Sequence, residues 1–374
     1  MKIAPFKLER FFARYEFKAP YLLCSSDCEA MTIRELLDLE PGAREQFDAQ
    51  WLGYTESEGG MALREAITGL YERIEPGQVL TFTGAEEAIF VFFNALLDRG
   101  DHVIVHTPCY QSLTEIATAI GCEVTRWQTH EADDWELDLD LLRRSIKPNT
   151  RAIVVNCPHN PTGYQMQPDT QRQIVVIARQ HGLLLFSDEV YRHLEQDPSD
   201  TLPAACDLYE NAVALGVMSK TYGLAGLRVG WIATRSADAR ARMAAFKDYT
   251  TICSSAPSEF LSLVALRHRD DIARRNVAIT RANLDLLDKC FARHADLFSW
   301  KRPRAGSTAF PGLKLDVSVE AFCEETVERS GVLLLPGTCF DDSSRNFRVG
   351  FGRKNLPEVL EHFEAFLAER VKRA

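Results

Sequence analysis

The sequence has no long apolar run of the kind that membrane proteins need. None of its hydrophobic stretches approaches the roughly 20 consecutive apolar residues that cross a bilayer as a helix. The start of the chain, Met1-Lys2-Ile3-Ala4-Pro5 and the residues after it, also lacks the apolar core of a secretory signal peptide. These two absences predict a cytoplasmic protein without a membrane partner.

An excess of positive charge is missing as well. The 43 Lys and Arg residues are outnumbered by 53 Asp and Glu residues, which gives a formal net charge of −10 at pH 7. A protein of that sign is repelled by nucleic-acid backbones and by anionic lipid surfaces. We therefore expect no nucleic-acid partner.

The sequence lacks clustered metal ligands. Its 10 cysteines are scattered, and only Cys24 and Cys28 lie close together. Neither a second pair nor histidines at ligand spacing accompany these two. The thiols are typical of small buried hydrophobic groups in a reducing compartment, and we expect no metal site.

Two nucleotide-binding signatures are also absent. No Gly-x-Gly-x-x-Gly run follows a predicted strand, which disfavours a nicotinamide dehydrogenase. The glycine-rich run from Gly53 to Gly60 does not follow a strand and lacks the Gly-Lys-Ser/Thr ending of a P-loop.

The chain does contain a long alternation of apolar strands and helices. Its 374 residues, 46% of them hydrophobic, suffice for two domains. We expect strands at 79–83, 102–106, 152–156, 183–186, 212–217 and 229–233, with helices such as 85–97 and 112–120 between them. The alternation predicts an α/β fold with a mostly parallel central sheet, helices on both faces, and ligands at the carboxyl ends of the strands.

The last eighty or so residues have a different pattern. Short strands are expected at 307–310, 332–335 and 347–351, and helices at 318–329 and 355–371. This mixture predicts a smaller α+β domain that the N-terminal residues complete. We expect a large α/β domain over 39–260 and a small domain built from 1–38 and 261–374, which closes over the site.

Lys220 stands where an apolar strand gives way to a turn broken by glycines. The run 212–217 carries it to the edge of the sheet, and Gly223 and Gly226 let the chain double back. Arg228 then opens the next apolar run and returns to the same neighbourhood. An amine and a planar guanidinium beside tight backbone suit an anionic cofactor.

The segment Ser219-Lys220-x-x-Gly223-x-x-Gly226-x-Arg228-x-Gly230 resembles the Schiff-base segment of the class I/II aminotransferases, which are fold-type I pyridoxal-phosphate enzymes. Further matches follow in the family's order from Tyr54 to Arg348. The resemblance implies pyridoxal 5'-phosphate (PLP) as cofactor. It also implies that Lys220 binds PLP as an aldimine and moves the substrate's α-proton through a quinonoid intermediate.

The resemblance also assigns the residues around the cofactor ring. Asp188 would keep the pyridine nitrogen protonated, and Tyr110 would stack on the ring. Asn160, in the turn Asn160-Pro161-Thr162-Gly163, and Tyr191 would share the phenolic oxygen. The catalytic set is therefore expected to be Lys220, Asp188 and Tyr191.

The phosphate group is expected to lie where a predicted strand leads directly into a helix. The amides of Gly84, Ala85 and Glu86 are free at such a helix start. Arg228 and Ser219 would join them. In the family a tyrosine at the position of Tyr54 reaches this phosphate from the neighbouring subunit, which implies a homodimer.

Arg348 lies on a strand flanked by apolar residues, where burying its charge is costly without a carboxylate partner. The resemblance supplies the α-carboxylate of an amino-acid substrate, which Asn160 would also contact. An internal salt bridge is the alternative.

The chain departs from the family pattern at several points. Val217 stands where a serine is common, which removes one phosphate hydroxyl. The loop Cys24-Ser25-Ser26-Asp27-Cys28 replaces a Gly-x-Gly-x-Pro-like run. This loop and Pro158-His159-Asn160-Pro161-Thr162-Gly163 are nearer to capreomycidine-synthase-like members and carbon–sulfur β-lyases.

Two activities therefore follow from the resemblance. The first is an aminotransferase that moves the amino group of an L-amino acid to a 2-oxo acid. The second uses the same site for β- or γ-elimination or for cyclisation. Whether Asp27, Glu29 or Glu56 recognises a cationic substrate tail stays open.

Overall fold

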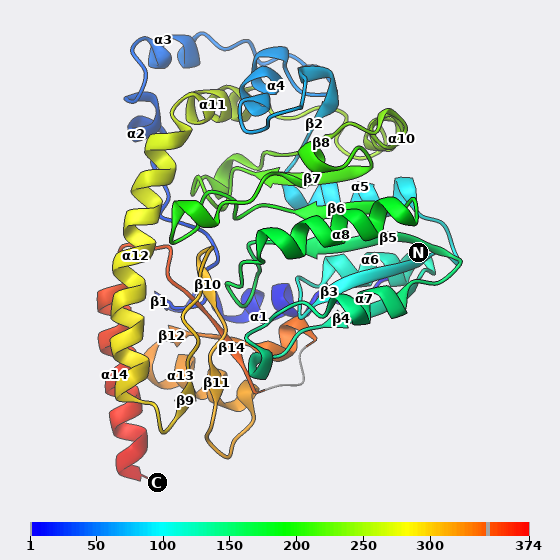
Figure 1. Ribbon diagram of the computed structural model, residues 1–374. Helices are drawn as coiled ribbons and strands as arrows, with labels where there is room; N and C mark the ends of the chain where they lie inside the picture. Colours follow the sequence, from blue (N-terminus) through cyan, green and yellow to red (C-terminus); the bar gives the residue numbers. More distant parts are fainter. Residues whose placement is uncertain (1, 342–344, 374) are drawn as a thin grey trace.

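A seven-stranded sheet organises the larger part of the molecule in the computed structural model, which describes residues 2–341 and 345–373 (Figure 1). In spatial order its strands are β2 (Val79–Phe82), β8 (Gly230–Thr234), β7 (Ala212–Val217), β6 (Leu184–Asp188), β5 (Thr150–Asn156), β3 (His102–Thr107) and β4 (Glu123–Gln128). Strand β8 pairs antiparallel with both β7 and β2, whereas the other neighbouring pairs are parallel. The sheet is therefore mostly parallel, as predicted.

Helices cover both faces of this sheet because alternate strand residues point to opposite sides. Val103 and Val105 belong to one core, whereas Ile104 between them belongs to another. The surrounding helices are α4 (Met61–Thr68), α5 (Ala85–Leu96), α6 (Ser112–Ile120), α7 (Leu139–Ser145), α8 (Pro168–Gln180), α9 (Ala205–Leu208), α10 (Ala237–Lys247) and α11 (Ala256–Arg267). Two shorter helices, α2 (Ile33–Leu37) and α3 (Ala43–Asp48), contact α11. Both faces of the sheet are thus largely removed from water, although β4 at its edge keeps partly exposed residues.

A smaller α+β part lies beyond one edge of the sheet and draws on both ends of the chain. Its strand pairs are β1 (Tyr21–Leu22) with β12 (Val332–Leu333) and β9 (Phe298–Ser299) with β11 (Gly312–Leu313). A third small sheet orders β10 (Thr308–Ala309), β14 (Phe347–Gly350) and β13 (Leu335–Pro336). Helices α13 (Val319–Ser330) and α14 (Leu356–Arg373) pack on them.

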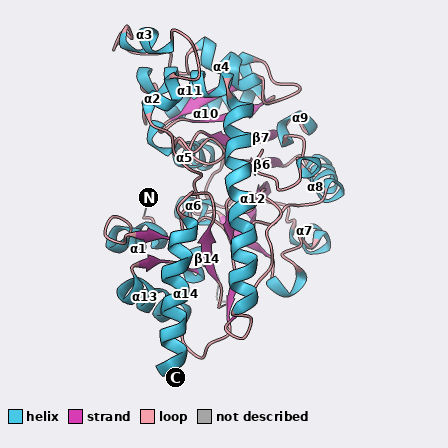
Figure 2. Cartoon of the chain, turned by 90° about the vertical axis from the view of Figure 1, so that its left-hand side faces the viewer, coloured by secondary structure: helices cyan, strands magenta, loops and turns pink. Residues whose placement is uncertain are grey.

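Two helices link the parts. Helix α12 (Arg269–Arg293) runs along the side of the molecule from the large part to the small one (Figure 2). Helix α1 (Lys7–Tyr15) packs beside the turn that follows β13. Within the described ranges, no helix combines the length and apolar character needed to cross a membrane.

The predicted α/β class is confirmed, and most predicted elements fall within a few residues of their observed bounds. The expectation for 212–217 coincides with β7, and that for 112–120 coincides with α6. The proposed division at 38/39 and 260/261 stays a prediction. Leu37 and Leu261, which flank these boundaries, both pack in a cluster against β8.

Candidate active site

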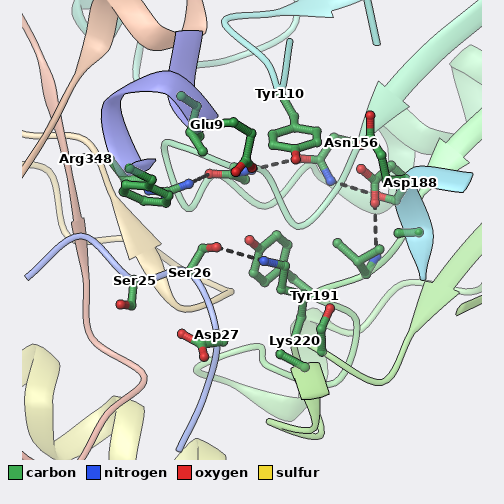
Figure 3. Close-up of a pocket in the computed structure, with 18 of the residues that line it drawn as sticks. Glu9, Ser25, Ser26, Asp27, Tyr110, Asn156, Asp188, Tyr191, Lys220 and Arg348 are labelled. Carbon is green, nitrogen blue, oxygen red and sulfur yellow. Dashed lines mark hydrogen bonds between the residues drawn. The ribbon is translucent and has the colours of Figure 1, made fainter. Parts of the chain in front are cut away.

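A cavity of about 350 Å³ opens at the carboxyl ends of the parallel strands, between the sheet and the smaller part. Figure 3 shows Lys220, Asp188, Tyr191, Tyr110 and Arg348 around it. Ser219, Lys220 and Arg228 come from the β7–β8 connection, and Asn160 follows β5. The further residues that line it are Leu8, Glu9, Phe12, Glu16, Ser25, Ser26, Asp27, Ala85, Glu86, Ile89, Asn156, Val190, Ala225 and Arg353. This is the strand edge at which a ligand was predicted.

Lys220 reaches into this cavity from the end of β7. Its Nζ donates a hydrogen bond of 2.8 Å to the hydroxyl of Ser26 and lies 5.7 Å from the ring centroid of Tyr191. The Ser26 carbonyl in turn accepts a bond of 2.8 Å from the hydroxyl of Ser307. The loop that replaces the glycine-rich run of the family therefore brings a hydroxyl to the lysine amine.

Asp188 is the last residue of β6 and is only 6% exposed. Burial raises the pKa of its carboxyl to about 7, although the amide of Val190 donates to it at 3.3 Å and Lys220 lowers it. It forms no ion pair with any residue that the structure describes. A cationic ring nitrogen would therefore stabilise its charged form.

Asn160 and Tyr191 lie beside Asp188. The amide of Asn160 donates to Asn156 Oδ1 at 2.7 Å, and Asn156 Nδ2 donates to the carbonyl of Asp188 at 2.9 Å. The hydroxyl of Tyr191 is buried and has no hydrogen-bond partner among the described residues. A buried hydroxyl of this kind is costly unless a ligand satisfies it.

Arg348 lies on β14 and is only 1% exposed. Its Nε and Nη2 donate to the carbonyl of Cys24 at 3.1 and 2.9 Å, and its Nη1 donates to Asn160 Oδ1 at 3.1 Å. These acceptors are neutral, and no carboxylate within the described ranges pairs with it. The alternative of an internal salt bridge thus finds no partner among the described residues, and none of them matches the charge that the arginine keeps beside the cavity.

A narrow cradle forms where α5 begins. Gly84 has φ +83°, and a Cβ at this position would lie 2.5 Å from Arg228 Nη2. Gly230 brings β8 equally close, since its Cβ would lie 2.9 Å from the amide nitrogen of Ala85. The amide of Gly84 is not free as predicted, because it donates to the Phe82 carbonyl at 2.9 Å. The amides of Ala85 and Glu86, at the start of α5, and the guanidinium of Arg228 face the same space, as an anion site requires.

Several lining residues were not found by the sequence reasoning. Ser26 belongs to a loop noted there only as a departure from the family. The amide of Glu86 was predicted as a ligand, but its carboxyl also faces the cavity, accepts a bond of 3.1 Å from Ser112, and has its pKa raised to about 7 chiefly by burial. Glu9 lies on α1 and Glu16 caps its C-terminal end, far in sequence from the family's motifs. Their helical i, i+7 spacing was the only signal available.

Other sequence candidates lie outside the cavity. The carboxylate of Glu29 accepts a bond from the amide of Lys354, and that of Glu56 pairs with Arg64. Asp27 does line the cavity, but it is held by Arg353 at 3.0 Å. Tyr54 is 87% exposed, so its predicted role in a neighbouring subunit stays a prediction.

These features fit the PLP that the resemblance implies. The unsatisfied hydroxyl of Tyr191 matches a phenolic oxygen, the Gly84–Arg228 cradle matches a phosphate, and the buried carboxyl of Asp188 matches a pyridinium.

Comparison with known proteins gives the same assignment. Residues 21–363 match the family model described as aminotransferase class I and II. The chain is 32% identical over 350 residues to capreomycidine synthase from Streptomyces vinaceus, covering 92% of this chain and 88% of that protein.

Solved structures agree with this result. A PLP-dependent aminotransferase from Streptococcus suis 89-1591 matches with a TM-score of 0.92 at 32% identity, covering 99% of both chains. The PLP-dependent cyclase OrfR matches with a TM-score of 0.90 at 31% identity, covering 99% of this chain and 98% of that one. Fold, site and relatives together show that this chain belongs to the class I and II aminotransferases, a family of PLP-dependent enzymes.

Proposed function

We propose that the protein is an aminotransferase that moves the amino group of an L-amino acid to a 2-oxo acid. The observation that carries the proposal is the convergence of Lys220, Asp188, Tyr191, Arg228 and Arg348 on one cavity. When bound, PLP accepts the electron pair that remains after the substrate loses its α-proton. Side chains of the protein accept that proton and deliver it to its next position.

Each charged side chain has a distinct task in this proposal. Lys220 Nζ takes the α-proton and returns it, and the Ser26 hydroxyl at 2.8 Å holds the free amine in place between these events. Asp188 holds the ring nitrogen, and Arg228 holds the phosphate with Ser219 and the amides of Ala85 and Glu86. Asn160 and Tyr191 hold the phenolic oxygen, and Tyr110 covers the ring.

Substrate orientation falls to Arg348. Because it is buried and has no carboxylate partner among the described residues, a substrate α-carboxylate gains a strong, charge-assisted contact there. Held at that point, the amino acid presents its α-carbon to the lysine amine. The buried position also keeps water from competing for the guanidinium.

A second activity, elimination or cyclisation, uses the same residues. Two observations support this second activity. The matched relatives include a capreomycidine synthase and a PLP-dependent cyclase. Moreover, the Ser26 hydroxyl places a proton-carrying group beside the lysine amine, where it can serve a second proton transfer.

Isotope tracing separates these activities. Holoenzyme is mixed with 15N-labelled L-amino acids and unlabelled pyruvate or 2-oxoglutarate, and the products are followed by mass spectrometry. Transamination transfers the label to newly formed alanine or glutamate. Elimination releases labelled ammonia, and cyclisation retains the label in a product that forms without a 2-oxo acid. Absence of labelled alanine and glutamate across the amino-acid panel would reject the aminotransferase proposal.

The assignment of Lys220 has its own test. Borohydride treatment of the protein with PLP, followed by peptide mapping, should place a phosphopyridoxyl group on Lys220. Lys220→Ala should lose both this adduct and at least about 10³-fold in turnover, since the proton-transferring amine is gone. An adduct on another lysine in the wild-type protein contradicts the assignment.

A further inference from the structure

We propose that Glu9 and Glu16 form a binding site for the cationic end of the substrate's side chain, so that the enzyme acts on amino acids carrying a guanidinium or ammonium group. This inference rests on the proposed use of the cavity for amino acids. It assigns a substrate class, which the cofactor-binding residues leave undefined.

Glu9 lies on α1 and Glu16 is the residue that caps its C-terminal end, so both carboxylates belong to one side of this segment; Glu9 is exposed and Glu16 is half-buried. Positions i and i+7 on a helix lie two turns apart on the same side, and Leu8 and Phe12 on this face also line the cavity. The helix is fixed in place, because the amide of Lys7 donates to Gln111 at 2.8 Å and Phe6 packs at 4.9 Å from the ring of Tyr110. Figure 3 shows Glu9 on this helix near Tyr110 and Arg348.

Among the described residues, pairing the charges of the cavity leaves the carboxyl groups of Glu9, Glu16 and Glu86 without a cation, and of these Glu86 accepts a hydrogen bond from Ser112. Glu9, Glu16, Asp27, Glu86 and Asp188 line the cavity, against Lys220, Arg228, Arg348 and Arg353. Arg353 forms an ion pair with Asp27. In the proposed function, the other three cations bind the cofactor and the substrate's α-carboxylate. Neither Glu9 nor Glu16 has an ion-pair partner within 4.0 Å among the described residues. The dianionic phosphate of PLP would make the cavity more negative still.

Two buried groups of this cavity lack, among the described residues, the partners that a ligand would supply, and Arg348 is the one of them that points to a carboxylate. The hydroxyl of Tyr191 is 2% exposed, lines the cavity and lacks a partner in the described part of the chain. Arg348 is 1% exposed and meets only neutral acceptors. A substrate held at Arg348 therefore has its other end free to reach the remaining charges.

The two glutamates also influence each other. Burial, and after it the negative charge of Glu9, raises the pKa of Glu16, while the positive charges of Arg353 and Arg348 partly oppose this rise. Like charges gathered at one wall are unfavourable until a cation separates them. A neutral side chain would leave this repulsion in place, and an acidic one would add to it, so the wall selects by charge.

Paired amino acids of matched shape test the proposal. L-arginine and its neutral isostere L-citrulline are titrated into holoenzyme, and the apparent dissociation constant is read from the absorbance of bound PLP. We expect arginine to bind at least about tenfold more tightly than citrulline, and this ratio to shrink at high salt. L-lysine and L-norleucine provide a second pair, with an ammonium in place of the guanidinium.

Variants then assign the preference to the two residues. Glu9→Gln and Glu16→Gln should each lower the arginine-to-citrulline ratio severalfold, and the double variant should bring it to about one. Glu45→Gln on α3 makes the same change of net charge on an exposed helix away from the cavity and should leave the ratio unchanged.

Three results overturn the inference. They are equal affinities for both members of each pair in the wild-type protein, a preference for the neutral member, and a preference that survives in the double variant. The wild-type comparison stands even if a variant fails to fold. A protein that shows no absorbance change with any amino acid, neutral or charged, would instead reject the proposed function itself.

Discussion

Burial changes the protonation of two carboxyl groups in the cavity, those of Asp188 and Glu86, which have different neighbours. Removal from water raises the pKa of each to about 7. Asp188 lies where a cationic ring nitrogen is expected, and that cation would favour its ionised form. Glu86 lies at the start of α5 beside the phosphate cradle, where an ionised carboxylate would repel the cofactor. Its raised pKa keeps a substantial fraction of this side chain neutral near pH 7.

Affinity for PLP should therefore depend on the protonation of Glu86. As the pH rises through about 7, this carboxyl ionises and its charge opposes the phosphate dianion. Glu86→Gln should bind PLP about three- to tenfold more tightly than the wild-type protein at pH 8.5 and nearly equally at pH 6. Titration of the apoprotein with PLP at both pH values measures this. A ratio that does not change with pH contradicts the prediction, since titrations common to both proteins cancel.

Arg348 should not tolerate replacement by lysine. A lysine keeps the charge but has no planar fork, so it cannot hold both the Cys24 carbonyl and a substrate carboxylate in the observed arrangement. Arg348→Lys should weaken amino-acid binding by about 10- to 100-fold, the effect of losing one or two charge-assisted bonds. The affinity for PLP should change little, because Arg348 belongs to the substrate side. Equal losses for cofactor and amino acid would show that its role is only structural.

At the scale of elements, the loop of residues 23–28 depends on its fit to β14. The amide of Gly350 donates to the Leu23 carbonyl at 2.8 Å, and Arg348 on the same strand binds the Cys24 carbonyl. A side chain at Gly350 has no room, because its Cβ would overlap the carbonyl of Ser25. The loop thereby places Ser26 at the lysine and Asp27 at Arg353.

Gly350→Ala should displace this loop. We expect a loss of stability of about 1–3 kcal/mol and a fall in amino-acid affinity, since overpacking at a site without room costs this much. Gly77→Ala is the matched control, because nothing lies within 4 Å of its Cβ position. Denaturant unfolding of both variants, together with titration by amino acids, checks the prediction. A Gly350→Ala protein as stable as the control would show that the backbone there adapts freely.

The sequence predicted the buried elements better than the half-exposed ones. Strand β7 is buried at every position and was placed at its observed bounds. Strand β4 was missed because its polar residues remain partly exposed, so no apolar run marks it. Motif residues such as Lys220 and Asp188 were found because their local spacing is distinctive. Glu9 and Glu16 escaped, since only the packing of α1 against Tyr110 brings them to the cavity.

The whole molecule exposes an apolar surface that a single chain does not use. Trp51, Leu52 and Tyr54 are 80%, 80% and 87% exposed. Adjacent exposed aromatic and aliphatic side chains of this kind are typical of protein interfaces. We propose a homodimer in which this segment contacts the second subunit and Tyr54 completes the neighbouring phosphate site.

Complementation between two defective chains tests this arrangement. Tyr54→Ala and Lys220→Ala each impair every site in their own homodimers. In a mixed dimer, one site receives an intact Tyr54 and an intact Lys220 from different chains. Random assortment should restore about a quarter of wild-type activity relative to total protein. If Tyr54 acts within its own chain, mixing restores nothing in that dimer.

The pairing of β1 with β12 has a consequence for synthesis on the ribosome. The cofactor-binding residues from Gly84 to Arg228 emerge as one continuous stretch. Leu22, in contrast, can pair with Leu333, and Cys24 can bind Arg348, only after the C-terminal part has been synthesised. Domains fold progressively from the N-terminus during synthesis. The residues that bind PLP are therefore complete long before Arg348, which binds the substrate's carboxylate in the proposed function. The contact for the substrate's carboxylate at Arg348 is therefore among the last parts of the site to be synthesised.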